Sequence, residues 1–330
     1  TRRHPRRSQL SVALRGRRAR NRATSMSTDS TSAPSRLALG VAFAIIYVIW
    51  GSTFLGILFA IQTLPPFLMA SARFLFAGSV LYAWSRLVNG AAAPSLANWR
   101  ATAVVGVLLL LGGNGLLVWS ELRIPSGVAA LLVGTVPCFM VLLDWLRPGG
   151  ARPTGLVIAG LLLGLLGLVW LVGPDTLMGG GRADLLGAVV VVLGSFLWAL
   201  GSVYSRHAAT PPSPFLSTAM QMLGGGAALL VVSVLAGEPW AFDVSAVSLR
   251  SVLGLLYLMV FGSIVAFSAY IWLLRVSTPT RVSTYAYVNP VIAVILGWAS
   301  PGEDLTPRMA IAAAVIVSGV ALITLAPKRA

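Results

Sequence analysis

Residues 66–78 read PFLMASARFLFAG, and residues 214–226 read PFLSTAMQMLGGG. At one fixed offset of 148 residues, the following positions coincide: Pro66, Phe67, Leu68, Leu75 and Gly78 meet Pro214, Phe215, Leu216, Leu223 and Gly226. The same shift carries Trp50 onto Trp198 and Gly106 onto Gly254. Because matches at one spacing extend through both halves, the sequence predicts a duplicated unit.

The composition around these stretches is that of a membrane protein. Hydrophobic residues make up 57% of the chain, charged residues only 10%, and the mean hydropathy is +0.86. A helix needs about 20 apolar residues to cross the hydrocarbon of a bilayer, and the alternation of barrel strands is absent from the sequence. We therefore predict an all-α integral membrane protein, embedded in the lipid bilayer, with ten transmembrane helices at 37–62, 66–88, 101–121, 126–146, 153–173, 184–206, 213–236, 248–275, 280–299 and 308–326.

The ten segments divide into two repeats of five, at 37–173 and 184–326. Since five is odd, the two copies of such a unit enter the membrane from opposite sides. Inverted repeats of this kind are typical of secondary transporters, which use them to alternate between two conformations around one central site.

Positive charge predicts the orientation. With the N-terminus inside, nine basic residues fall on the cytoplasmic side: Arg86, Arg100, Arg147, Arg152, Arg206, Arg275, Arg281, Lys328 and Arg329. Four fall outside: Arg123, Arg182, Arg250 and Arg308. This bias predicts that both termini lie in the cytoplasm.

The tail at 1–36 lies outside the repeats. Nine arginines and no acid occur in residues 1–25, and without them the net charge falls from +15 to +6. Three interpretations compete: a basic arm, a transit-type peptide, and sequence upstream of a true start at Met26, which we favour. The tail lacks the interleaved aromatic residues of single-strand binders, so we expect no nucleic-acid partner.

Several short motifs recur in a defined order. They are IWGST at 49–53, GNG at 113–115, IPSGVAA at 124–130, FGSI at 261–264 and STYAYVNP at 283–290. Together they resemble the drug/metabolite transporter superfamily, its EamA-domain branch, and most closely the YedA-type inner membrane transporters. The resemblance implies two inverted EamA repeats around a central cavity. It also implies transport of a small metabolite, an amino-acid-like or an amphipathic compound, often outward.

Deep polar and aromatic residues are the candidates for the walls of that cavity. Trp50 and Trp198 lie too deep for an interfacial belt, and small residues, among them Ser52 and Ser202, follow them. Asn114, Tyr285 and Asn289 add uncharged hydrogen-bonding groups, although such groups also bond neighbouring helices. We predict that these seven residues line a substrate-binding cavity.

Charged and proline residues complete the candidate site. Arg73 lies about 10 Å below the Pro66 end of its segment. It either snorkels or pairs with Glu121, or it anchors an anionic substrate group or half of an outer gate. Pro137 and Pro290 occupy matching segments, and each predicts a helix kink. Glu121 is also the only candidate for proton coupling, with H⁺ as the coupling ion, although an interfacial ion pair is the simpler interpretation.

Other functions find less support in the sequence. No serine–histidine pair, acid pair or His-Glu-x-x-His run suits an intramembrane enzyme, and no continuous polar ring suits a channel. No phosphate-binding loop for ATP is present, and Cys138 is the single cysteine. We expect a non-enzymatic carrier without metal or cofactor, acting on a small-molecule substrate as a monomer or homodimer.

Overall fold

The computed structural model describes residues 34–124, 126–150, 152–172, 184–298 and 307–327. Within these ranges every regular element is a helix, and none is a strand. Residues 39–330 form one compact unit, and the helix packing discussed below belongs to that unit.

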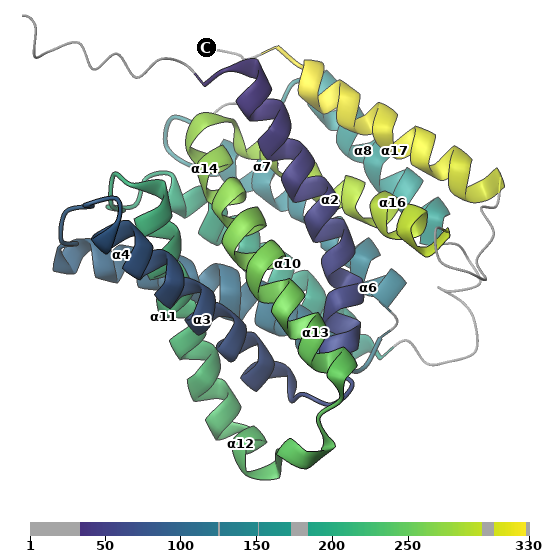
Figure 1. Ribbon diagram of the computed structural model, residues 1–330. Coiled ribbons are helices and arrows are strands. Elements are labelled where there is room, and N and C mark those ends of the chain that lie inside the picture. The colour runs from purple at the N-terminus through teal and green to yellow at the C-terminus, as the bar shows by residue number, and fades with distance from the viewer. Residues whose placement is uncertain (1–33, 125, 151, 173–183, 299–306, 328–330) are drawn as a thin grey trace, which may run out of the picture. The chain divides into compact units, whose positions relative to one another are not determined.

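The described residues of the first half form five helical stretches, several of which Figure 1 labels. They are α2 (Arg36–Ala60), α3 (Pro66–Leu87), a continuous stretch of α4 (Leu96–Gly106), η1 (Val107–Gly115) and α5 (Leu116–Ser120), then α6 (Ser126–Val133) with α7 (Val136–Leu146), and α8 (Gly155–Val172). Predicted segment 101–121 therefore begins five residues too late, because the box of hydrogen bonds between Ser95 and Asn98 caps the helix before Leu96.

The second half repeats this order. It holds α10 (Leu185–Ser205), α11 (Pro214–Leu235), a continuous stretch of α13 (Leu249–Tyr257), η3 (Leu258–Phe267) and α14 (Ser268–Val276), then α15 (Pro279–Val282) with α16 (Tyr285–Trp298), and α17 (Pro307–Leu325). The short helices α12 (Glu238–Ala241) and η2 (Val244–Ala246) lie between α11 and α13.

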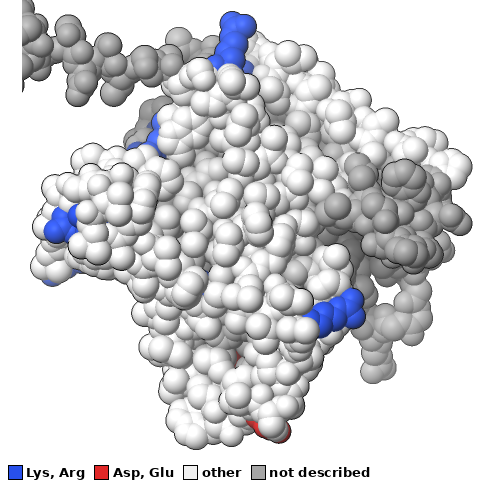
Figure 2. All heavy atoms as spheres, in the orientation of Figure 1, with Lys and Arg blue, Asp and Glu red and all other residues white. Residues whose placement is uncertain are grey.

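The described helices are long and apolar enough for a membrane. Seven stretches qualify as spans by length and hydropathy, and the apolar parts of α8 and α17 are shorter. Exposed side chains along them are large and hydrophobic, for example Leu162 and Leu166 of α8 and Val231 of α11. Figure 2 shows a face on which the described atoms are almost all uncharged, with basic and acidic groups confined to a few spots. The chain is an integral membrane protein.

Helices α3 and α11 carry the repeated stretch that opens the sequence, and they pack side by side (Figure 1). A Cβ on Gly78 would lie 2.9 Å from the Met222 Cβ and 3.1 Å from the Leu223 Cγ. A Cβ on Gly226 would lie 3.0 Å from the Leu75 Cγ. Gly78 thus contacts Leu223 of the other half, and Gly226 contacts Leu75 of the other half. Because Gly78 matches Gly226 and Leu75 matches Leu223 in the repeat, the contact is the same when the two halves are exchanged.

The third stretch of each half contains π-helical turns, which hydrophobic periodicity does not predict. These are η1 and η3, and each starts after a regular α-helix and returns to one. π-Helical turns widen a helix locally and often occur at functional sites. Both contain a glycine, Gly113 or Gly262, that lies against the central cavity.

The fourth predicted helix is broken, and so is the ninth. Turns at Gly134–Thr135 and at Ser283–Thr284 separate α6 from α7 and α15 from α16. Pro137 lies in the first turn of α7, directly after this break, where its missing N–H costs no helical hydrogen bond. Pro290, in contrast, lies inside α16.

Candidate functional site

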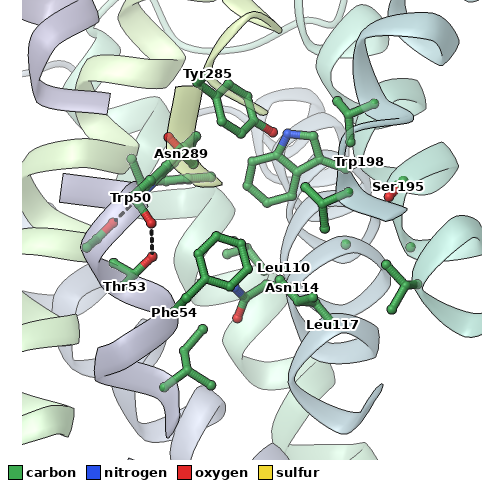
Figure 3. Close-up of a pocket in the computed structure, with 18 of the residues that line it drawn as sticks. Trp50, Thr53, Phe54, Leu110, Asn114, Leu117, Ser195, Trp198, Tyr285 and Asn289 are labelled. Carbon is green, nitrogen blue, oxygen red and sulfur yellow. Dashed lines mark hydrogen bonds between the residues drawn. The ribbon is translucent and has the colours of Figure 1, made fainter. Parts of the chain in front are cut away.

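One cavity lies at the centre of the compact unit, with about 740 Å³ of space free of protein atoms, including the part open to the outside. Its walls come from both halves of the chain (Figure 3). The residues labelled there are Trp50, Thr53, Phe54, Leu110, Asn114, Leu117, Ser195, Trp198, Tyr285 and Asn289. The lining combines aromatic and aliphatic side chains with a few hydrogen-bonding groups, which is the composition of a site for a small organic molecule.

Five of the seven residues predicted for the cavity line it: Trp50, Asn114, Trp198, Tyr285 and Asn289. Ser52 and Ser202 do not. The Ser202 hydroxyl is fully buried, donates to the Trp198 carbonyl oxygen and pairs with the Tyr270 hydroxyl at 2.5 Å. The Ser52 hydroxyl pairs with the Tyr257 hydroxyl. Each serine follows a tryptophan on its helix, but it lies outside the cavity lining, and its hydroxyl forms a hydrogen bond with a tyrosine hydroxyl.

Four aromatic rings meet at one end of the cavity. Trp50 lies edge-on to Trp198 at 5.6 Å between centroids and 4.9 Å from both Tyr270 and Tyr285. The Trp198 and Tyr270 centroids are 5.4 Å apart. We call Trp50, Trp198, Tyr270 and Tyr285 the aromatic cluster. The sequence does not predict Tyr270, because a tyrosine in an apolar segment with no matching partner in the first half carries no repeat signal.

The two tryptophans of the cluster are held through their indole nitrogens. Trp50 Nε1 donates to the Gly262 carbonyl oxygen at 3.2 Å, and Trp198 Nε1 donates to the Tyr270 hydroxyl at 2.8 Å. Trp198 also lies on Gly113, where a Cβ would approach its Cε3 to 2.5 Å. Each indole therefore contacts a glycine in the π-helical stretch of the other half, and it offers its ring face, not its N–H, to a solute.

The cavity extends from the aromatic cluster toward the Ala60 end of α2. Its lining follows Thr53, Phe54 and Ile57 in that direction. On the other side of the cluster, the Tyr47 and Thr284 hydroxyls lie 2.6 Å apart and tie α2 to the turn before α16. The cavity is thus closed at one end by aromatic packing and a hydrogen bond.

Arg73 is the cationic residue among the described lining residues. Its side chain is buried, with only 4% of the residue exposed, and its Nε donates to the Ser263 Oγ at 2.7 Å. The ion pairs found within the described residues join Arg123 to Asp184 and Arg147 to Asp144. The predicted pairing of Arg73 with Glu121 does not occur in this structure.

Glu121 ends the third stretch and is not among the residues that line the cavity. Its backbone N–H donates to the Leu117 carbonyl oxygen, which places it one turn beyond a lining residue. Both carboxylate oxygens are buried, and neither has a hydrogen-bond partner among the described residues. Pairing with Arg73 is one of the alternatives that the sequence leaves open, because spacing gives only the depth of the two groups and not the direction of their side chains.

The two asparagines of the cavity lining differ in whether their side-chain polar atoms have hydrogen-bond partners. The Asn289 amide nitrogen, in the orientation that suits its neighbours, donates to the Tyr47 and Tyr285 carbonyl oxygens. The Asn114 Oδ1 is buried without a hydrogen-bond partner among the described residues. Figure 3 shows the Asn114 side chain beside Phe54 at the cavity. The Asn114 amide oxygen is therefore an unsatisfied acceptor in this structure.

The chain has relatives among named transporters. It is 39% identical over 287 residues to the inner membrane transporter YedA of Escherichia coli (strain K12), with 87% of this chain and 90% of YedA covered. It is 28% identical over 287 residues to a transporter of Archaeoglobus fulgidus, covering 85% of this chain and 95% of that protein.

A solved structure, described as "Crystal structure of protein", has the same fold. It superimposes with a TM-score of 0.72 at 24% sequence identity, covering 88% of this chain and 98% of the other. The family described as "EamA-like transporter family" matches residues 38–173 and again residues 185–325. Two matches that together span most of the sequence, with a relative at 39% identity, assign the chain as a membrane transporter that belongs to the EamA-like transporter family.

Proposed function

We propose that the protein is a secondary carrier that moves a small metabolite, amino-acid-like or amphipathic, across the cytoplasmic membrane by alternating access, in the outward direction. The observation that supports this most is the central cavity, which both halves line and which the aromatic cluster closes at one end. A closed end that depends on a few ring contacts and hydrogen bonds can open without unfolding a helix.

The carrier in this proposal has ten transmembrane helices in two inverted repeats, 37–173 and 184–326. The two ranges matched by the family support these boundaries. The exchange-symmetric contact of Gly78 and Gly226, and the π-helical and broken stretches at matching places, support a common ancestor for the halves. Antiparallel copies would let the two ends of the cavity open by equivalent movements.

We place both termini in the cytoplasm, following the distribution of arginine. The Ala60 end of α2 is then the outer end, the structure is open to the outside, and the aromatic cluster closes the inner end. An inward-open state would require Tyr47 to separate from Thr284 and the four rings to part.

The energy for transport comes, in this proposal, from a solute or ion gradient. The described lining residues include no aspartate, glutamate or histidine, so a proton would have to bind outside the lining, with Glu121 as the candidate. Comparing flux with and without a pH gradient tests this part.

The test of the carrier function is flux of a labelled metabolite panel in proteoliposomes. Asn114→Trp fills the cavity, and we expect flux to fall at least tenfold with the protein still folded. The matched control is Val107→Trp, on the same continuous stretch, whose side chain is 38% exposed and outside the lining. Equal flux in wild type and a folded Asn114→Trp variant would refute transport through this cavity.

A further inference from the structure

The guanidinium of Arg73 lies inside the protein without a charged partner in the part of the chain that the structure describes. Its only described hydrogen bond runs from Nε to the neutral Ser263 hydroxyl, which leaves the two terminal nitrogens without one. No carboxylate lies within ion-pair distance of it among the described residues. The neighbouring Phe74 ring, 4.7 Å from the guanidinium carbon, gives only weak compensation.

A buried cation without a counter-charge is costly, by several kcal/mol per ion even after the protein relaxes. Such a group persists only where something offsets the cost or where the protein uses it. The acid that the sequence suggests as a partner, Glu121, does not pair with it, and the described lining residues bring no acid to the cavity. The missing negative charge must therefore come from outside the described protein.

The surroundings of Arg73 provide space for its terminal nitrogens. A Cβ on Gly262 would lie 2.8 Å from Nη2, so only glycine at this position leaves the guanidinium where it is. Gly262 is itself held in place, because its carbonyl oxygen accepts the Trp50 indole N–H. Ser263, the next residue, orients the guanidinium through Nε. Two consecutive residues of η3 thus position the group at the cavity.

We infer that the cavity binds an amphipathic organic monoanion, whose carboxylate pairs with the terminal nitrogens of Arg73 and whose flat apolar part lies against Trp50, Phe54 and Trp198. This inference rests on the proposed carrier function. A planar fork of two N–H donors matches a carboxylate in two parallel hydrogen bonds. One guanidinium balances one negative charge, so a dianion would leave a second charge buried in an apolar cavity.

Asn114 lies beside the path that the remainder of such a solute would take. Its Oδ1 is buried without a partner, and its amide nitrogen is a donor that suits a neutral acceptor on the solute. With the carboxylate at Arg73, the remainder of the molecule extends past Asn114 toward Leu117 and the open end.

Pairs of probes that differ only in charge test the inference. We would measure binding of benzoate and benzamide, phenylacetate and phenylacetamide, and indole-3-acetate and indole-3-acetamide to the full chain in nanodiscs by calorimetry. Phthalate serves as the dianion. For at least one pair, the wild type is expected to bind the acid at least tenfold more tightly than the amide, and benzoate more tightly than phthalate.

Arg73→Gln introduces the residue found at the matching position of the second half. It is expected to abolish the preference for the acid while the affinity for the amide changes less than threefold. The matched control is Arg123→Gln, since Arg123 pairs with Asp184 away from the cavity, and this variant should keep the wild-type preference. Gly262→Ala and Ser263→Ala displace or release the guanidinium without removing its charge, and both should reduce the preference partially.

Equal binding of acids and amides by the wild type, or a preference that survives in folded Arg73→Gln, would overturn the inference. If Arg73→Gln does not fold, the wild-type comparison decides, since equal binding of each acid and its amide has the same meaning. Flux of only neutral or cationic metabolites through the cavity would refute the monoanion and leave the carrier intact. Flux of no metabolite, together with no binding of any probe, would refute both.

Discussion

The two halves of the protein share their backbone architecture and differ in what they bring to the cavity. Both have π-helical turns in the third stretch, a break in the fourth, and a glycine that accepts the other half's leucine. At the position where the first half has Arg73, the second has Gln221. Gln221 is also buried, but its Nε2 donates back to Ser217 on its own helix, and it does not line the cavity. The two halves thus share the packing of α3 and α11, and only the first half brings a charged side chain, Arg73, to the described lining of the cavity.

The tryptophans show the same combination of likeness and difference. Trp50 and Trp198 match in the repeat and approach each other across the interface between the halves. The Trp50 N–H binds a main-chain oxygen, whereas the Trp198 N–H binds a tyrosine hydroxyl that Ser202 also holds. A main-chain acceptor cannot be exchanged by mutation, whereas a side-chain network can. Trp50 is therefore held by the main chain, and Trp198 by side chains.

The largest effect on stability should come from substitutions at the α3–α11 contact, to which both halves contribute equivalent residues. Gly78→Leu and Gly226→Leu each force a side chain between α3 and α11, and overpacking of this kind costs about 1–3 kcal/mol or more. Because the two contacts are equivalent, we expect similar falls in the midpoint of thermal unfolding in detergent. Gly40→Leu is the control, since no described atom lies within 4 Å of the position its Cβ would take. A fall in only one of the two α3–α11 variants would mean that the packing is not symmetric.

A smaller effect should distinguish Arg73 from Gln221. Arg73→Met removes an uncompensated buried charge and keeps the volume, so the empty protein should become more stable by about 1 kcal/mol. Gln221→Met removes only a side-chain hydrogen bond and should cost about 0.5–1.5 kcal/mol. Thermal unfolding without added solute measures both. A loss of stability in Arg73→Met would indicate that the charge has a partner inside the protein.

Substitutions of the two tryptophans should differ by less in the stability that they cost. Trp50→Phe leaves the Gly262 carbonyl oxygen without its donor and should cost about 1 kcal/mol. Trp198→Phe should cost less, because the Tyr270 hydroxyl keeps Ser202 as a partner. Double substitution measures whether the two are independent. Equal costs would mean that the second partner of the Tyr270 hydroxyl, Ser202, gives no compensation.

The smallest effect concerns how the first helix of each half begins. Ser35 accepts the Ala38 N–H with a neutral hydroxyl, whereas Asp184 accepts the Leu186 and Gly187 N–H groups with a carboxylate. The hydrogen bond from Arg123, with help from those N–H groups, holds the pKa of Asp184 below its usual value. A lowered pKa adds stability above the usual aspartate value, about 3.9, and the contribution is lost as pH falls through the lowered value.

Thermal unfolding of wild type and Asp184→Asn at pH 6 and pH 3 checks this prediction. The wild type should be the more stable at pH 6, and the difference should shrink at pH 3. A difference that does not depend on pH would show that the carboxylate charge has no part in capping α10.

Much of the fold could be predicted because lipid imposes long apolar helices and a repeat reveals their order. The helix interruptions could not, since a π-helical turn or a break at Gly134 depends on packing against other segments. In the site, depth and residue type identify Trp50, Trp198, Asn114, Tyr285 and Asn289. The direction of a side chain does not follow from the sequence. For this reason the sequence could not show that Ser52 and Ser202 lie outside the lining, or that Glu121 lies apart from Arg73.

The central claim is that the two halves are antiparallel copies around one cavity. The most direct measurement is labelling of single cysteines, in a Cys138→Ser background, with a membrane-impermeant maleimide in intact cells. Asn89→Cys and Ala241→Cys lie after the second helix of the first and second half, respectively. The account predicts that Ala241→Cys reacts in intact cells and Asn89→Cys reacts only after permeabilisation. Reaction of both positions from the same side would contradict it.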